Sequence, residues 1–319
     1  MNDILILTLL NIPQLSRKII NAIIKKNNKE DMRYENIVDL IRQAKSINSR
    51  INIPTNEELT KYKEDAENIV KVSKLNGIGN ITILDEDFPE RLKNIEDAPV
   101  ILFYKGNKEC ILENKSVAII GTRNPTHCGE EIAEKLGAIF GSQGFVVTSG
   151  LAKGCDEFGH KGCVGVAGRS IAVLPGGLDK VYPASNKTLA NLILENKGCL
   201  VSEYPIGKRP FKSSFVERDR LQSALSQAVI VVETDVVGGT MHTVGYTLQQ
   251  KRILVCYNHP KEHLDFKQTR GNQKLIREKK AIGIYSKNDI EKLKKLVEEK
   301  ASSIIKEELP VVGIQQKLF

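Results

Sequence analysis

The chain has 319 residues, of which 41% are hydrophobic and 27% are charged, as in an ordinary globular protein. This length allows a full hydrophobic core and predicts two domains. The net charge of +8 favours a polyanionic partner, although a general bias in composition would raise the charge without any binding role. No apolar run reaches the roughly 20 residues of a membrane span, so no membrane-embedded segment is expected.

The cysteines and the N-terminal segment indicate the compartment. The six cysteines include no C-x-x-C pair, which argues against a zinc site or a disulfide framework and is typical of a reducing cytoplasm. The segment 1–12 is apolar but short, contains Asp3, and lacks a basic leader and a small-residue cleavage site. It is not expected to be a signal peptide. We therefore expect a cytoplasmic protein without a bound metal.

Residues 1–80 are predicted to form a small N-terminal helical domain. Apolar residues recur there at helical spacing, as at Ile37, Leu40, Ile41 and Ala44. The segment 75–81 has two interpretations: a hairpin within a nucleic-acid-binding helical module, or a linker turn before a strand at 81–84. The second interpretation is favoured.

Residues 81–306 alternate between apolar strands and helices. Further strands are predicted at 116–120, 145–148, 170–174, 199–202, 228–233, 253–257 and 281–285. Helices are predicted at 128–142, 156–167, 187–196, 240–250, 271–279 and 287–299. This alternation predicts an α/β fold with a doubly wound, mostly parallel sheet, and the continuous apolar strands indicate burial on both faces. Residues 307–319 are predicted to be a tail.

Four glycine-containing turns follow predicted strands, at 121–123, 149–150, 175–177 and 238–240. Parallel strands bring such turns to one rim of the sheet, where ligands bind. Glycine lets the backbone approach a phosphate closely, and helix N-termini offer free N–H donors. One such turn could serve only the connection to a helix, but four together favour a shared anion site. The candidate phosphate-binding residues are Gly121, Thr122, Arg123, Ser149, Gly150, Gly238, Gly239 and Thr240.

The turns also limit the kind of ligand. None of them reads G-x-G-x-x-G or G-x-x-x-x-G-K-[ST], so an ordinary NAD or ATP site is not supported and no cofactor is expected. Arg123 adds a planar cation that can hold a phosphate through two hydrogen bonds.

The segment 205–220 combines five basic residues with Phe211 and Phe215. Cations can follow a nucleic-acid backbone while aromatic rings stack on bases, so the pattern favours a single strand. The alternative is a solvated loop whose phenylalanines return to the core. A second basic run, 267–280, is interpreted as a solvated helix face.

Catalysis has little support in the sequence. Asp156, Glu157 and His160 follow the second glycine turn and could form an acid–base set, but such groups more often cap a helix. Asp156 and His160 lie four positions apart and would share a helix face. No serine nucleophile motif and no metal-ligand cluster is present, so no catalytic residue is predicted.

These motifs resemble the DNA-processing protein A family (DprA, also called Smf). The resemblance runs from about Ile81 to about Leu293. It is carried by ITILDEDFPERLKNIEDAPVILFYKGN, VAIIGTRNPTHCG, SGLAKGCDEFGH, IAVLPGGLDKVYPASNKTL, LVSEYP, FVERDRLQSALS, VVE and GNQKLIREKKA. It implies an extended Rossmann-like domain that binds single-stranded DNA, forms a homodimer and loads a RecA-type recombinase onto incoming DNA during natural transformation. In such a family member, the residues that hold phosphates would be Arg123, Lys187, Arg218 and Arg220.

Some residues depart from the family pattern. The usual F-P-x-R-N-R run is F-V-E-R-D-R here, so Asp219 adds a negative charge between two arginines. The segment that begins at Gly238 reads G-G-T-M-H-T-V in place of S-G-[AS]-L-x-T-A. These departures indicate a divergent member, for which a role in phage or plasmid defence is an alternative to transformation.

Two other functions on a similar fold remain open. A nucleotide-processing hydrolase would carry P-G-G-x-G-T-x-x-E, but Pro175-Gly176-Gly177 continues as Leu-Asp-Lys and lacks that glutamate. A sensor that binds a small nucleotide signal in the same pocket cannot be separated from a DNA-binding protein by these residues alone.

Overall fold

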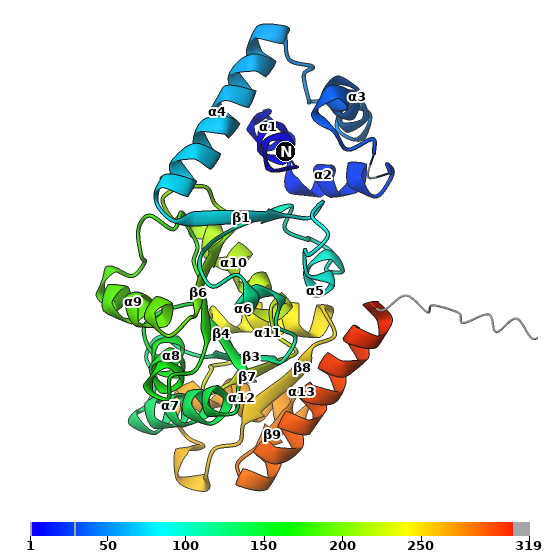
Figure 1. Cartoon of the computed structure of the whole chain (residues 1–319). Helices are drawn as coiled ribbons and strands as arrows, with labels where there is room; N and C mark the ends of the chain where they lie inside the picture. The colour runs from blue at the N-terminus through cyan, green and yellow to red at the C-terminus, as the bar shows by residue number, and fades with distance from the viewer. Residues whose placement is uncertain (1, 29, 309–319) are drawn as a thin grey trace, which may run out of the picture.

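The computed structural model describes residues 2–28 and 30–308 (Figure 1). Its N-terminal part is helical, and its helices are α1 (Asn2–Asn11), α2 (Arg17–Ile24), η1 (Tyr34–Asn36), α3 (Ile37–Ile47) and α4 (Asn56–Leu75). α4 begins with a capping box, in which the Thr55 side chain accepts from the Glu58 N–H and the Glu58 carboxylate accepts from the Thr55 N–H. Gly77, with a φ of 68°, then turns the chain into the sheet.

One nine-stranded sheet forms the centre of the molecule. Its strands are β1 (Ile78–Thr82), β2 (Ile101–Gly106), β3 (Ser116–Ile120), β4 (Val146–Ser149), β5 (Ser170–Val173), β6 (Cys199–Ser202), β7 (Ala228–Val231), β8 (Ile253–Tyr257) and β9 (Ile282–Ile284). The strand order is β1-β2-β6-β5-β4-β3-β7-β8-β9. β2 pairs antiparallel with β1 and β6, and all other pairs are parallel.

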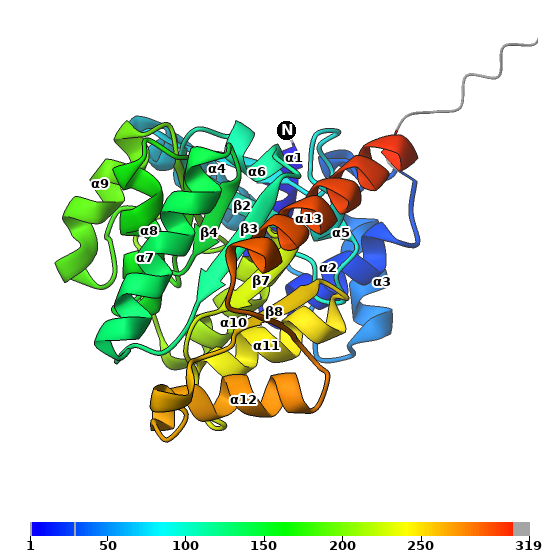
Figure 2. The same cartoon turned by 90° about the horizontal axis from the view of Figure 1, so that it is seen from below.

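Helices cover both faces of this sheet. They are α5 (Glu90–Lys93), α6 (Glu109–Leu112), α7 (His127–Ser142), α8 (Cys155–Gly165), η2 (Ala184–Asn186), α9 (Lys187–Glu195), α10 (Lys212–Ala224), α11 (Thr240–Gln249), η3 (Lys261–His263), η4 (Lys267–Thr269), α12 (Arg270–Arg277) and α13 (Lys287–Glu308). Figure 2 shows α7 and α8 on one side of the strands and α11 and α12 on the other. The predicted α/β, Rossmann-like, doubly wound fold is therefore confirmed.

The side chains of β3 show how both faces are buried. Val117 and Ile119 pack with α7 and α13, whereas Ala118 and Ile120 pack with α11 and α12. Successive side chains of a strand point to opposite faces, so both sets must be apolar. This explains why the parallel strands read as continuous apolar runs.

The N-terminal helices share a hydrophobic core with one end of the sheet. This core joins residues of α1–α4 to Ile101 and Phe103 of β2 and to Ile193 of α9. In Figure 1 the four helices lie beyond β1, the strand at the edge of the sheet. The proposed domain limits, 1–80 and 81–306, stay predictions. The predicted tail, 307–319, lies outside the described residues except for its first two, which belong to α13.

Several local predictions differ from the structure, among them the last helix, which was predicted to end at residue 299 and ends at Glu308. The first strand begins at Ile78 and not at residue 81. Strand β2 was not among the predicted strands. Its apolar run pairs antiparallel with β1 and β6 and does not belong to the alternation of parallel strands and helices. The basic segment 205–220 runs into helix α10 at Lys212, which was not among the predicted helices because its amphipathic pattern is weak. Within the described residues, no helix has the length and apolar character needed to cross a membrane.

Candidate functional site

A cleft of about 580 Å³ opens at the carboxyl ends of the parallel strands. It lies between the turn after β3, the first half of α10 and the loop that leads from β7 to α11. The predicted turn residues that line it are Gly121, Thr122, Arg123, Gly238, Gly239 and Thr240. A smaller cavity of about 260 Å³ beside it shares Arg123, Phe215 and Arg218 and includes Gly150. The structure thus brings three of the four predicted turns together.

The fourth turn is covered by the chain. Gly177 donates its N–H to the carbonyl of Lys208 at 2.8 Å, and a Cβ atom at Gly176 would contact the same carbonyl. The segment that begins at Pro205 therefore occupies the space that a ligand would need at this turn. Only Pro175 of the turn reaches the smaller cavity.

The buried Glu233 holds the turn that carries Arg123. Its backbone carbonyl accepts from the N–H of Thr122 at 2.8 Å. Its carboxylate accepts from the N–H and the hydroxyl of Thr126 at 2.8 and 2.6 Å, and Thr126 in turn caps α7 by accepting from Gly129. These hydrogen bonds fix the backbone of the turn, so the exposed Arg123 side chain extends from a fixed position.

Arg123 lies beside the ring of Phe215, which in turn packs against a second aromatic ring. Its guanidinium carbon is 5.7 Å from the ring centroid of Phe215, and Phe215 meets Tyr182 edge to face at 5.3 Å. The ring of Tyr182 is about half exposed. A cation next to accessible aromatic faces is the arrangement that accommodates a phosphate together with a base.

Arg218 lies beneath both cavities and is only 5% exposed. Its Nη1 is 3.8 Å from Oδ2 of Asp156, and its Nε is 3.4 Å from Oδ1 of Asp219. Neither nitrogen has a hydrogen-bond partner among the described residues. A Cβ atom at Gly150 would collide with this guanidinium, so only glycine lets the arginine lie against the turn. The site therefore holds a buried cation, two of whose nitrogen atoms donate no hydrogen bond within the described residues.

Two acids next to Arg218 reduce the positive charge of the cleft. Burial raises the pKa of Asp156. Burial also raises the pKa of Asp219 to about 6, and this effect exceeds the opposing effect of Arg218. The positive charge of the site therefore grows as the pH falls through this range.

Asp156 and His160 both lie on α8, but only Asp156 lines the cleft. Asp156 lines the cleft and accepts from the N–H of Gly150 at 3.1 Å. His160 is fully buried, its Nδ1 is 2.7 Å from the Ser170 hydroxyl, and burial lowers its pKa to about 3. Since His160 does not line the cleft, this pair does not form an acid–base set there.

Three of the predicted phosphate-binding residues lie away from the cleft. Ser149 is buried and donates to the carbonyl of Ile119 at 2.6 Å. Lys187 is exposed at the start of α9 and lines neither cavity. Arg220 is 1% exposed and donates to both carboxylate oxygens of Glu203 at 2.5 and 2.6 Å. None of these three residues lines the cleft or the smaller cavity.

Two cationic or titratable residues of the cleft were not chosen from the sequence. Lys212, the first residue of α10, lines the cleft, and so does His242 in the first turn of α11. Lys212 belonged to the basic segment that the sequence singled out. No sequence pattern around His242 pointed to the cleft, because its position there depends on where α11 begins relative to β3.

The fold and the cleft define a Rossmann-like protein with an arginine-lined cleft at its strand ends. Residues 79–295 match the family described as DNA recombination-mediator protein A, and the chain belongs to this family. The DNA processing protein DprA of Bacillus subtilis is 33% identical over 195 residues, which are 61% of this chain and 65% of that protein. The corresponding protein of Streptococcus pneumoniae is 38% identical over 54% of this chain and 60% of its own length. The chain thus matches less than two thirds of the length of these relatives.

Solved structures show the same relationship. The X-ray structure of DNA processing protein A from Streptococcus pneumoniae superposes with a TM-score of 0.74 at 26% identity, covering 91% of this chain and 96% of that chain. A structure that describes the single-stranded DNA binding mode of DNA processing protein A from Helicobacter pylori gives a TM-score of 0.59 at 25% identity. It covers 72% of this chain and 96% of that chain.

Proposed function

We propose that the cleft binds single-stranded DNA without strong sequence preference. The observation that carries this proposal is Arg218, a buried cation whose Nε and Nη1 lack hydrogen-bond partners among the described residues and which lines a cleft together with Arg123. A buried donor without a partner is costly, and a phosphate oxygen would satisfy it. The family membership and the DNA-binding relative from Helicobacter pylori support the same ligand.

The phosphates would lie between the arginines and the start of α11. Gly238 and Gly239 are exposed and leave open space where a side chain would stand, so the backbone N–H groups before α11 are accessible. The bases would lie against Phe215 and Tyr182. Stacking on aromatic rings does not discriminate strongly among bases, which is why we expect little sequence preference.

The proposed role needs no catalysis. The cleft offers cations and glycine turns, which hold phosphates without breaking bonds. Its carboxylates are Asp156, Asp219 and Asp235, and no histidine lies within hydrogen-bonding distance of Asp156 among the described residues. We therefore propose a binding protein and not a hydrolase.

We further propose that the protein is a cytoplasmic homodimer that loads a RecA-type recombinase onto single strands during DNA uptake. The family description as a recombination mediator supports this role. The test is ATP hydrolysis by a RecA-type recombinase on single strands coated with a single-strand-binding protein. Addition of the purified chain should shorten the lag, and an unchanged lag would contradict the mediator role.

A nucleotide-signal sensor is the second candidate, because a cleft of about 580 Å³ lies within the size range of small-ligand sites. The decisive experiment compares a fluorescent deoxyoligonucleotide, the matching duplex and free mononucleotides by anisotropy and competition. Preference for the single strand supports the proposed function. Displacement of the oligonucleotide by a mononucleotide at similar concentration would favour the sensor, and preference for the duplex would contradict both.

A further inference from the structure

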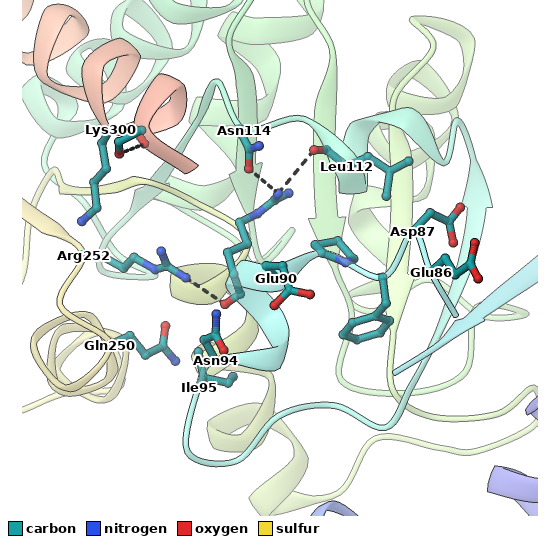
Figure 3. A pocket seen from close by; sticks show the side chains of 14 residues that line it. Glu86, Asp87, Glu90, Asn94, Ile95, Leu112, Asn114, Gln250, Arg252 and Lys300 are labelled. Carbon is teal, nitrogen blue, oxygen red and sulfur yellow. Dashed lines mark hydrogen bonds between the residues drawn. The ribbon is translucent and has the colours of Figure 1, made fainter. Parts of the chain in front are cut away.

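A second cavity of about 900 Å³ lies near the amino ends of β3 and β8, and Figure 3 shows the side chains that line it. Asn114 comes just before β3 and Arg252 just before β8, so the cavity adjoins the amino ends of these strands, and β3 leads from it to the first cleft. Arg91 of α5 and Lys300 of α13 complete its basic wall. The two cavities share no lining residue.

The basic wall is held in place by neutral oxygen atoms. Arg252 donates through Nη2 to the carbonyl of Arg91 at 2.9 Å, and Arg91 donates through Nη1 to Oδ1 of Asn114 at 3.0 Å. Lys300 donates to the carbonyl of Lys251 at 2.8 Å. Nε of Arg252 is buried and has no hydrogen-bond partner among the described residues. These bonds to neutral carbonyl groups orient Arg252 and Lys300 without neutralising their charges.

Carboxylates do not compensate Arg252 and Lys300. Among the side chains that the structure describes, neither has a carboxylate within ion-pairing distance. Burial lowers the pKa of Arg252 to about 10, and burial together with the charge of Arg252 lowers the pKa of Lys300. Poor solvation causes the shift of Arg252, and poor solvation together with a neighbouring like charge causes the shift of Lys300.

The acidic residues of the cavity are placed elsewhere. Figure 3 shows Glu86 and Asp87 at the opposite side of the cavity from Arg252 and Lys300. The carboxylate of Asp87 pairs with Lys108. Glu90, which lies between the two sides, pairs with Lys93 at 2.7 Å. The ion-pair partners of Asp87 and Glu90 are thus lysines outside the basic wall, and within the described residues neither acid pairs with Arg252 or Lys300.

We propose that this cavity binds a small phosphate-bearing molecule through Arg252 and Lys300. The guanidinium group of Arg252 and the ammonium group of Lys300 both line the cavity and can each donate to a phosphate oxygen, and the doubly charged group would offset their mutual repulsion. The cavity size matches small-molecule sites.

The test is calorimetric titration of the full chain with inorganic pyrophosphate. The wild type should bind one equivalent, and Lys300→Gln should weaken the affinity roughly tenfold or more, as expected for loss of a charged hydrogen bond. Lys295→Gln is the matched control, because Lys295 is an exposed lysine of the same helix that does not line the cavity. Arg252→Gln should weaken binding in the same way, with its thermal unfolding curve measured alongside. Equal weakening by Lys295→Gln, or saturable binding that both cavity variants leave unchanged, would overturn the proposal.

An Arg123→Ala variant separates this cavity from the first cleft. Pyrophosphate binding should persist in Arg123→Ala and decline in Lys300→Gln, and the reverse order would assign the anion to the strand-end cleft and overturn the proposal. Oligonucleotide titrations of the same proteins test the other source of phosphate. If Lys300→Gln weakened only oligonucleotide binding and pyrophosphate did not bind, the cavity would belong to a DNA path, and the small-molecule proposal would be wrong.

Discussion

Arg218 and Arg220 lie two positions apart on α10, and their guanidinium groups serve opposite sides of the helix. Arg218 Nη1 lies 3.8 Å from Asp156 beneath the cleft, whereas Arg220 Nη1 lies 2.5 Å from Glu203 on the side of the N-terminal helices. Two helical positions are separated by about 200°, so one arginine must turn away when the other faces the cleft. The two residues thus have different roles despite their shared motif.

This pair gives the first prediction. Arg218→Ala should weaken single-strand binding roughly tenfold or more, because a charged hydrogen bond to phosphate is lost. Arg220→Ala should instead lower the free energy of unfolding by about 3–5 kcal/mol, because it leaves the largely buried carboxylate of Glu203 with only the more distant Arg17, at 4.0 Å. Anisotropy and urea denaturation of both variants provide the measurements.

The same pair contains its own control. Arg218→Ala should change mainly the DNA affinity, and Arg220→Ala should change mainly the free energy of unfolding. Each variant therefore serves as the control for the other. If Arg220→Ala kept full stability and lost DNA affinity as far as Arg218→Ala does, the assignment of Arg220 to the structural network would be wrong.

The second prediction concerns Arg123 and salt. On single strands the logarithm of the binding constant falls with the logarithm of salt concentration, with a slope of about −0.7 for each phosphate neutralised. Arg123→Ala should therefore make this slope shallower by about 0.7 and leave thermal stability nearly unchanged, because the side chain is exposed. Arg123→Lys should restore most of the slope but only part of the affinity, since the planar fork is lost. An unaltered slope in Arg123→Ala would place the phosphates elsewhere.

The third prediction is a pH dependence set by Asp219. Burial raises the pKa of this carboxyl to about 6, so it is charged above that pH and neutral below it. DNA affinity should therefore increase as the pH falls from 7 to 5, and Asp219→Asn should bind more tightly at pH 7 with a flatter profile.

His242 lines the same cleft. The pH profiles with Asp219 and with Asp219→Asn should therefore be compared in proteins that both carry His242→Gln. The free energy of unfolding should change with pH in the same direction as the DNA affinity. A group whose folded pKa is raised favours folding more when protonated, so Asp219 lowers stability as the pH rises above its unfolded value, most fully above about 6. Affinity profiles that coincide with and without the Asp219→Asn substitution would exclude this role for the carboxylate.

The fourth prediction is the absence of turnover. The purified chain should leave nucleoside monophosphates, NAD and DNA strands intact over long incubation, as judged by chromatography. Asp156 is the carboxylate best placed to contradict this, because it lines the cleft beside Gly150. Hydrolysis that appeared in the wild type and vanished in Asp156→Asn would establish an enzyme.

Sequence patterns predicted most of the parallel sheet because its strands are buried on both faces and therefore read as apolar runs. The antiparallel β2 lacks that context, and its pairing with β6 joins residues about one hundred positions apart, such as Phe103 and Ser202. Helix α10 was missed for a related reason. Its buried residues include Arg218, Arg220 and Gln222, so polarity does not follow burial along it.

The sequence by itself determined the fold class, the family and the glycine turns at the strand ends, because local periodicity and short motifs specify these features. Only the tertiary structure decided which residues share the cleft. Arg218 and Arg220 have the same chemistry in sequence, but the packing of α10 places one over Gly150 and pairs the other with Glu203. The second basic cavity likewise exists only because α13 returns to place Lys300 beside Arg252. Such juxtapositions depend on contacts between distant segments, and no local pattern encodes them.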